Sequence, residues 1–153
     1  MSERVLVVDD EQGFCDLMAT HLLRHGYEVE SAFNGQEALE KLEAQEPFAV
    51  IVTDLTMPVM GGLELIREAR KRFPQMEVIV LTANDSIEMA IATMREYGAY
   101  DYLTKPLPTN SDLSMAVGRA AVYRRLRLER ELLQTQLITQ AKRLQALIAN
   151  TGD

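Results

Sequence analysis

The fold is decided by the stretch AVIVTD at residues 49–54 and by the loop LTMPVMGG that follows at residues 55–62. The first part is an apolar run rich in β-branched residues, which is typical of a strand buried on both faces in a parallel sheet. The run ends on Asp54. Because ligands of open α/β sheets bind outside the carboxyl ends of the strands, Asp54 stands where a functional group is expected. Pro58 and Gly61-Gly62 then permit a sharp return into the next helix.

The rest of the chain repeats this alternation of strand and helix. Strands are predicted at residues 4–8, 27–33, 49–54, 77–82 and 99–103. Helices are predicted at residues 12–25, after Asn34-Gly35, at 63–73, from Asp85-Ser86 to about residue 97, and from Asn110-Ser111-Asp112 to about residue 149. Five strands alternating with five helices predict an α/β fold, a doubly wound parallel sheet with helices on both faces.

Composition limits the classes of function. The 153 residues carry a net charge of −7, with 10 Lys and Arg against 20 Asp and Glu in residues 1–123, and 6 against 3 in residues 124–153. The acidic part argues against direct nucleic-acid binding. No apolar run approaches the ~18 residues of a membrane span, so we expect no membrane contact. The single cysteine, Cys15, and the absence of a signal-peptide pattern indicate a cytoplasmic protein without an internal disulfide.

Polar residues gather at the carboxyl ends of the predicted strands: Asp9 and Asp10, Asp54, Thr82 and Lys105. Parallel topology brings these ends to one edge of the sheet. Three crowded carboxylates repel one another unless a cation intervenes, and carboxylate oxygens are the ligands that Mg²⁺ prefers. A lysine and a hydroxyl beside them can hold phosphoryl oxygens. The pattern therefore predicts an aspartate that accepts a phosphoryl group.

These residues belong to motifs that span roughly residues 3–123. The motifs are Asp9-Asp10-Glu11, Asp54-x-x-Met57-Pro58-x-Met60-x-Gly62, Leu81-Thr82-Ala83, Tyr102 and Lys105-Pro106. With them the chain resembles the receiver domain of the two-component response-regulator family, which has the chemotaxis-regulator-like fold. The resemblance implies a flavodoxin-like sheet with strand order 2-1-3-4-5 and a receiver domain over residues 1–123.

The resemblance also implies a role for each site residue. Asp54 would accept the phosphoryl group from a phosphohistidine of a sensor histidine kinase or a histidine phosphotransfer protein. The Mg²⁺ ligands would be Asp9, Asp10, Asp54 and the backbone carbonyl of Thr56. Thr82 and Lys105 would hold phosphoryl oxygens, and the Lys105-Pro106 peptide would be cis. Thr82 and Tyr102 would switch the face formed by the fourth helix, the fifth strand and the fifth helix.

Two other functions compete with this hypothesis. A phosphatase of the haloacid-dehalogenase type also places an aspartate after an apolar strand, but it needs a second acid two residues later, where this chain has Thr56. A dimerisation module with an inactive site would not need the intact set of acids, threonine and lysine. We therefore expect a signalling module, not an enzyme, whose only chemistry is its own aspartyl phosphorylation and dephosphorylation.

Residues 124–153 form a second region. Neither Gly nor Pro interrupts residues 119–151, so the last helix is expected to continue far beyond the receiver. Its apolar stripe approximates a short coiled coil: Val122, Leu126, Leu133, Leu137, Ala141, Leu144 and Ile148. We expect a parallel homodimer through this extension, although an amphipathic helix folded back on its own domain is the alternative. Residues 144–153 resemble the start of a PAS-type sensory module, so the extension is expected to be a linker to an absent output or sensory domain.

Overall fold

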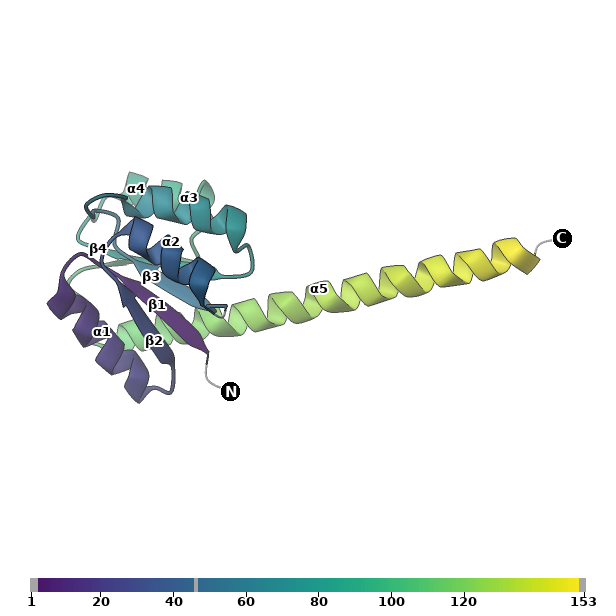
Figure 1. The fold of residues 1–153 in the computed structure, drawn as a ribbon, viewed down its shortest axis with the longest axis horizontal. Coiled ribbons are helices and arrows are strands. Elements are labelled where there is room, and N and C mark those ends of the chain that lie inside the picture. The colour runs from purple at the N-terminus through teal and green to yellow at the C-terminus, as the bar shows by residue number, and fades with distance from the viewer. Residues whose placement is uncertain (1–2, 46, 152–153) are drawn as a thin grey trace.

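The computed structural model describes residues 3–45 and 47–151, and these residues form the predicted α/β fold (Figure 1). The last two residues of the PAS-like segment lie outside this range. The elements in chain order are β1 (Arg4–Val8), α1 (Gln12–Arg24), β2 (Glu28–Ala32), α2 (Gly35–Ala44), β3 (Val50–Thr53), α3 (Gly62–Arg72), β4 (Glu77–Thr82), α4 (Ile87–Arg95), β5 (Asp101–Thr104) and α5 (Ser111–Thr151). All strand pairs are parallel in the order β2-β1-β3-β4-β5, which confirms the predicted topology.

The sheet is buried on both faces, which explains why its central strands are apolar without interruption. In β1, Val5 and Val7 pack toward α1 and α5, whereas Leu6 and Val8 pack toward α2 and α3. Figure 1 shows the same two layers, with α1 and α5 on one side of the sheet and α2, α3 and α4 on the other. The central strands β1, β3 and β4 are buried along almost all of their length, so their carboxyl ends, with the loops that follow, are the parts available for a site.

The region around β5 differs from the prediction. Helix α4 ends at Arg95 and not near residue 97, and β5 begins at Asp101 and not at Ala99. Gly98 adopts a φ of 75°, and the Ala99 N–H returns to the Thr93 carbonyl. The residues between the two elements thus end the helix before the strand begins. The pattern of apolar residues does not predict where this end lies.

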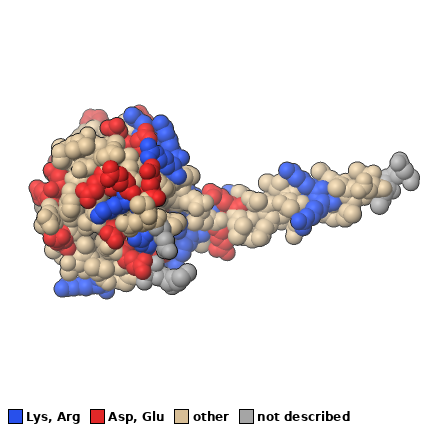
Figure 2. Space-filling model, viewed as in Figure 1, with Lys and Arg blue, Asp and Glu red and all other residues tan. Residues whose placement is uncertain are grey.

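Helix α5 continues from the receiver into the extension without a break, as predicted, and carries the chain well away from the sheet (Figure 1). The boundary predicted at residue 123 lies inside this helix, and contacts with the receiver persist for another turn, as far as Arg127. Beyond that point the extension is mostly uncharged surface in Figure 2. Among the described residues, no helix has the combined length and hydrophobicity that crossing a membrane requires.

Candidate functional site

Three aspartates meet at the carboxyl edge of the sheet. Asp9 and Asp10 follow β1, and Asp54 follows β3, which pairs with β1. One carboxylate oxygen from each lies within 4.8 Å of the others. Asp9 is 1% exposed and Asp54 9% exposed, whereas Asp10 is open to solvent. Two of the three acids at this edge of the sheet, Asp9 and Asp54, are therefore buried, and the third, Asp10, is accessible to solvent.

Lys105, in the loop after β5, holds two of these acids together. Its Nζ donates to Asp9 Oδ2 at 2.6 Å and to Asp54 Oδ2 at 3.2 Å. The ammonium also lies 4.3 Å from the centre of the Phe14 ring, a cation–π contact. These hydrogen bonds and charges outweigh the effect of burial, which would lower the pKa, so the pKa of Lys105 lies above its ordinary value. The Lys105-Pro106 peptide is cis, as the resemblance implied.

The second oxygen of Asp54 is held by the loop that follows β3. Asp54 Oδ1 accepts from the N–H of Leu55 at 2.6 Å and from the N–H of Thr56 at 3.3 Å. Burial favours the protonated carboxyl, but the Thr82 hydroxyl, the Lys105 ammonium and the Thr56 N–H together outweigh it and lower the pKa of Asp54. Asp54 is thus ionised at neutral pH, which is the protonation state that nucleophilic attack by a carboxylate requires.

Gly62 fixes the path of this loop. Its N–H donates to the Leu55 carbonyl at 2.9 Å, and an added Cβ would stand 2.2 Å from the Asp54 carbonyl oxygen. A side chain there would displace the backbone of the aspartate itself. The prediction that Gly61-Gly62 permit a sharp return is thus met mainly by Gly62, because an added Cβ at Gly61 would meet only one atom, at 3.2 Å.

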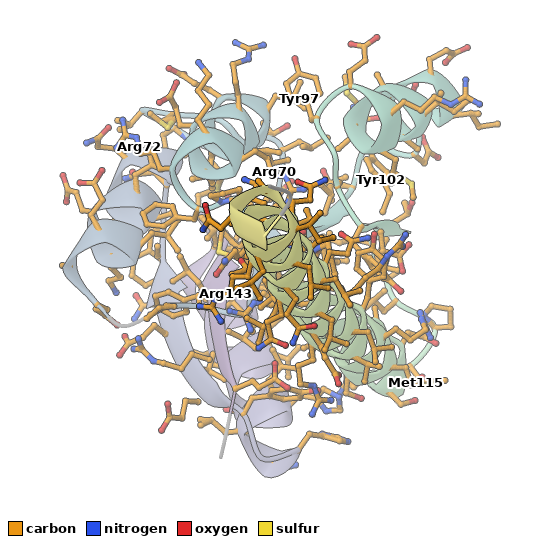
Figure 3. All side chains as sticks on the ribbon, turned by 90° about the vertical axis from the view of Figure 1, so that its right-hand side faces the viewer. Arg70, Arg72, Tyr97, Tyr102, Met115 and Arg143 are labelled. Carbon is orange, nitrogen blue, oxygen red and sulfur yellow. The ribbon has the colours of Figure 1, made fainter. Side chains whose placement is uncertain are left out.

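Thr82 and Tyr102 lie on two paired strands, β4 and β5, and β4 also pairs with β3, the strand that Asp54 follows. Thr82 ends β4 and is buried, and its Oγ1 accepts from the N–H of Asn84 at 3.4 Å. The Tyr102 hydroxyl of β5 donates to the carbonyl of Asn84 at 2.8 Å. In Figure 3 Tyr102 lies on the same side of the molecule as Met115 of α5. One loop residue, Asn84, therefore contacts both side chains that were predicted to act as a switch.

The donor set fits a hard divalent cation. Mg²⁺ is bound by oxygen atoms, and Asp9, Asp10 and Asp54 offer one carboxylate oxygen each around a common point. Asp9 would present its oxygens in a fixed orientation, because its Oδ1 accepts from the Glu11 N–H at 2.9 Å. Thr56 stands beside them through its N–H contact with Asp54. The use of its carbonyl as a ligand stays a prediction.

Sequence reasoning missed two contributors to the site. Phe14 is not among the predicted site residues, but its ring lies against Lys105. The carbonyl of Asn84 holds Tyr102. A signal existed for Phe14, since it comes one turn after the acidic run at residues 9–11, but a backbone carbonyl leaves no trace in a sequence.

Comparisons with known proteins agree with this geometry. Residues 5–117 match the family model of the response regulator receiver domain. A CheY-like receiver domain protein from Methanospirillum hungatei JF-1 is 31% identical, with a TM-score of 0.77 over 83% of this chain and 99% of that chain. The chemotaxis response regulator CheY4 of Vibrio cholerae is 32% identical, with a TM-score of 0.71 over 78% of this chain and 99% of that chain.

A third structure relates this chain to a longer protein. NtrX from Brucella abortus is 31% identical, with a TM-score of 0.79 over 88% of this chain but only 29% of the NtrX chain. The matched family model covers most of the present chain and includes the three aspartates, Thr82 and Lys105. The chain therefore belongs to the response regulator receiver family.

Proposed function

We propose that this protein is a phosphorylation-controlled signalling module in which Asp54 accepts a phosphoryl group from the phosphohistidine of a sensor histidine kinase or a histidine phosphotransfer protein. One observation carries the proposal. The Lys105 ammonium is hydrogen-bonded to both Asp9 and Asp54 beside a third carboxylate, which places one fixed positive charge next to the ionised nucleophile. The family comparison supports the same chemistry. Such a module would act in the cytoplasm, where its kinase partner presents the phosphohistidine.

The transfer exchanges one bond for another. An Asp54 carboxylate oxygen forms the O–P bond while the N–P bond of the donor breaks, and the histidine nitrogen keeps the electron pair. Lys105 and Thr82 would hold the oxygens of the transferring group, and Asp9, Asp10, Asp54 and the Thr56 carbonyl would hold Mg²⁺. A bound Mg²⁺ supplies positive charge that offsets the charge on those oxygens. Chemistry beyond this self-modification and its reversal is not part of the proposal.

Intact mass after incubation with acetyl phosphate and Mg²⁺ tests the proposal. We expect one phosphoryl adduct that is absent in Asp54→Asn and absent in EDTA. Asp85→Asn is the matched control, because Asp85 is an exposed acid outside the site. An adduct that persists in Asp54→Asn, or that forms equally well in EDTA, would contradict the proposal. Turnover of an added phosphomonoester would favour the phosphatase instead.

Phosphorylation would then change the face formed by α4, β5 and α5. Thr82 would move toward the phosphoryl group and Tyr102 would turn inward, which requires the Tyr102 hydroxyl to leave the Asn84 carbonyl. NMR chemical shifts should therefore change on phosphorylation throughout residues 82–105. In Tyr102→Phe, which has no hydroxyl to release, the shift of Asn84 should respond less. Changes confined to residues 9–11 and 54–62 would refute the switch.

The extension would pair with a second copy of the chain. Its leucines are exposed along a helix that leaves the receiver, so folding back would require a bend that α5 does not have (Figure 1). Burial of one leucine side chain contributes about 1.5–3 kcal/mol, and several together can outweigh the cost of association. Light scattering separates the two alternatives, because only pairing doubles the mass.

A further inference from the structure

The extension carries a regular set of core positions that the receiver does not cover. From Leu126 onward, steps of four and three residues alternate, and the positions are Leu126, Arg130, Leu133, Leu137, Gln140 and Leu144. This spacing is that of the core of a two-stranded coiled coil. The four leucines are between 52% and 65% exposed. Four of the six seam positions are thus leucines, with a cation at the second position and an uncharged amide, Gln140, at the fifth.

The receiver lies on the opposite side of α5. In the first turns, Leu113, Ala116, Val117 and Ala120 are buried against the sheet. In the turn that leaves the receiver, Arg124 Nε donates to the Gln75 carbonyl at 3.0 Å, and Arg127 Nη2 lies 2.9 Å from Glu77 Oε1. Leu126, between these two arginines in the sequence, remains exposed. The seam therefore faces away from its own domain, where a second helix can approach.

The seam also continues backward onto the receiver. Met115 and Val122 are 58% and 45% exposed, and with Arg119 between them they precede Leu126 by steps of four, three and four residues. The next step, from Leu126 to Arg130, is again four residues, and such a stutter unwinds the supercoil locally without ending the seam. Figure 3 shows Met115 at the outer side of α5. A parallel, in-register pair covers this segment as well as the extension. An antiparallel pair centred on the leucines places Val122 opposite position 148 of the partner but leaves Met115 beyond the end of the partner's helix, so the exposure of Met115 favours the parallel arrangement.

Arg130 then needs an acid from the other chain. Arg130 lies three residues before the next core residue, Leu133, so it occupies an a position of the heptad and Glu129 occupies the preceding g position. In a parallel pair, the g residue of one helix lies beside the a residue that follows it on the partner helix. Within one helix, consecutive residues do not face each other, so Glu129 cannot neutralise Arg130 of its own chain. We propose that two copies of the chain pair in parallel and in register along this seam, with Arg130 of each helix paired to the partner's Glu129.

The charged layer has a clear physical consequence. A polar residue in a coiled-coil core lowers stability relative to a leucine, but it selects the register and orientation in which it finds its partner. This inference rests on the pairing in the proposed function and specifies how that pairing is oriented. It places both phosphoacceptor sites at the same end of the dimer.

Charge exchange tests the layer. Glu129→Lys places two lysines beside two arginines, and Arg130→Glu places four glutamates together, so each variant alone should dimerise roughly tenfold more weakly than the wild type. Mixed in equal amounts, the two variants should form a heterodimer of near wild-type affinity, because each altered layer then regains opposite charges. Sedimentation velocity over a concentration series, with an affinity tag on one variant, measures both effects.

Two control variants make the same charge changes away from the seam. These are Glu131→Lys and Lys142→Glu, both exposed, and both should dimerise like the wild type. The proposal is overturned if the single variants dimerise like the wild type or if mixing does not restore pairing. Failed restoration is the outcome for an antiparallel pair, in which Arg130 faces Gln140 and Glu129 faces Arg143. The phosphoryl adduct on Asp54, measured in the same samples, reports on the phosphorylation switch independently.

Discussion

The receiver and the extension use the same apolar residue types in opposite ways. Ile51, in the central strand, is 1% exposed, because helices of the same chain cover both faces of the sheet. Leu137, in the middle of the extension, is 65% exposed. Both residues lie in patterns that indicate burial. The difference shows that a hydrophobic period reports that a surface is to be covered, but it does not report which molecule covers it.

The largest contrast between the two regions should appear in stability. Ile51→Ala should lower the free energy of unfolding of the receiver by roughly 2–5 kcal/mol, because it opens a cavity in a packed layer. Leu137→Ala should change the same quantity by less than about 0.5 kcal/mol, because its side chain contributes nothing to that layer. Instead, it should weaken dimerisation. Urea denaturation, followed by a signal from the receiver, measures the first effect, and light scattering measures the second.

Either of two results would break this contrast. If Leu137→Ala destabilised the receiver as strongly as Ile51→Ala does, the extension would pack on its own domain in solution. If Leu137→Ala left both stability and mass unchanged, the seam would have no partner. Gln136→Ala, an exposed neighbour outside the core positions, is the matched control for helix propensity.

Much of the receiver could be predicted because its local signals agree with one another. Apolar strands that end on Asp9, Asp54 and Thr82 imply that these residues meet, since parallel strands share a carboxyl edge. The predicted start of β5 was wrong by two residues, because the residues of this short strand are only partly buried and no sharp change in hydrophobicity marks its beginning. The contact of Lys105 with Phe14 depends on the packing of two distant segments, and one sequence does not contain that distance.

The helical structure of the extension could be predicted, but the contacts that fix its first turn to the receiver could not. The absence of Gly and Pro and the apolar stripe were sufficient for the helix. Nothing in the run Arg124-Arg125-Leu126-Arg127 indicated that its three arginines contact the receiver. Arg125 pairs with Glu3 at 3.3 Å, and Arg124 and Arg127 donate to the loop before β4. These contacts form the joint between the two regions.

A smaller effect is expected at this joint. Arg127 Nη2 pairs with Glu77 Oε1 at 2.9 Å, and the Glu77 side chain is almost fully buried. Arg127→Ala leaves that carboxylate without its nearest cation and should cost about 1–3 kcal/mol of receiver stability, less than for a fully enclosed pair because Arg127 is partly exposed. Arg125→Ala is the control, because its pair with Glu3 is more exposed and should contribute below about 1 kcal/mol. Equal losses in the two variants would show that the burial of Glu77 is not decisive.

The pH dependence of this loss identifies its cause. Burial raises the pKa of Glu77 above its ordinary value of 4.5, against the opposing charges of Arg127, Arg70 and Arg124. The native state therefore binds this proton more tightly than the unfolded state, and the contribution of Glu77 to stability falls as the pH rises from about 4.5 through the raised pKa. Removal of Arg127 raises that pKa further. The loss of receiver stability in Arg127→Ala should thus be largest near neutral pH and should shrink toward pH 4, where Glu77 is protonated in both states.

In Glu77→Gln, which cannot titrate, removal of Arg127 should lower the stability by the same amount at both pH values. If the deficit of Arg127→Ala were already independent of pH with Glu77 intact, the joint would depend on the hydrogen bonds of Arg127 to the backbone and not on the buried charge.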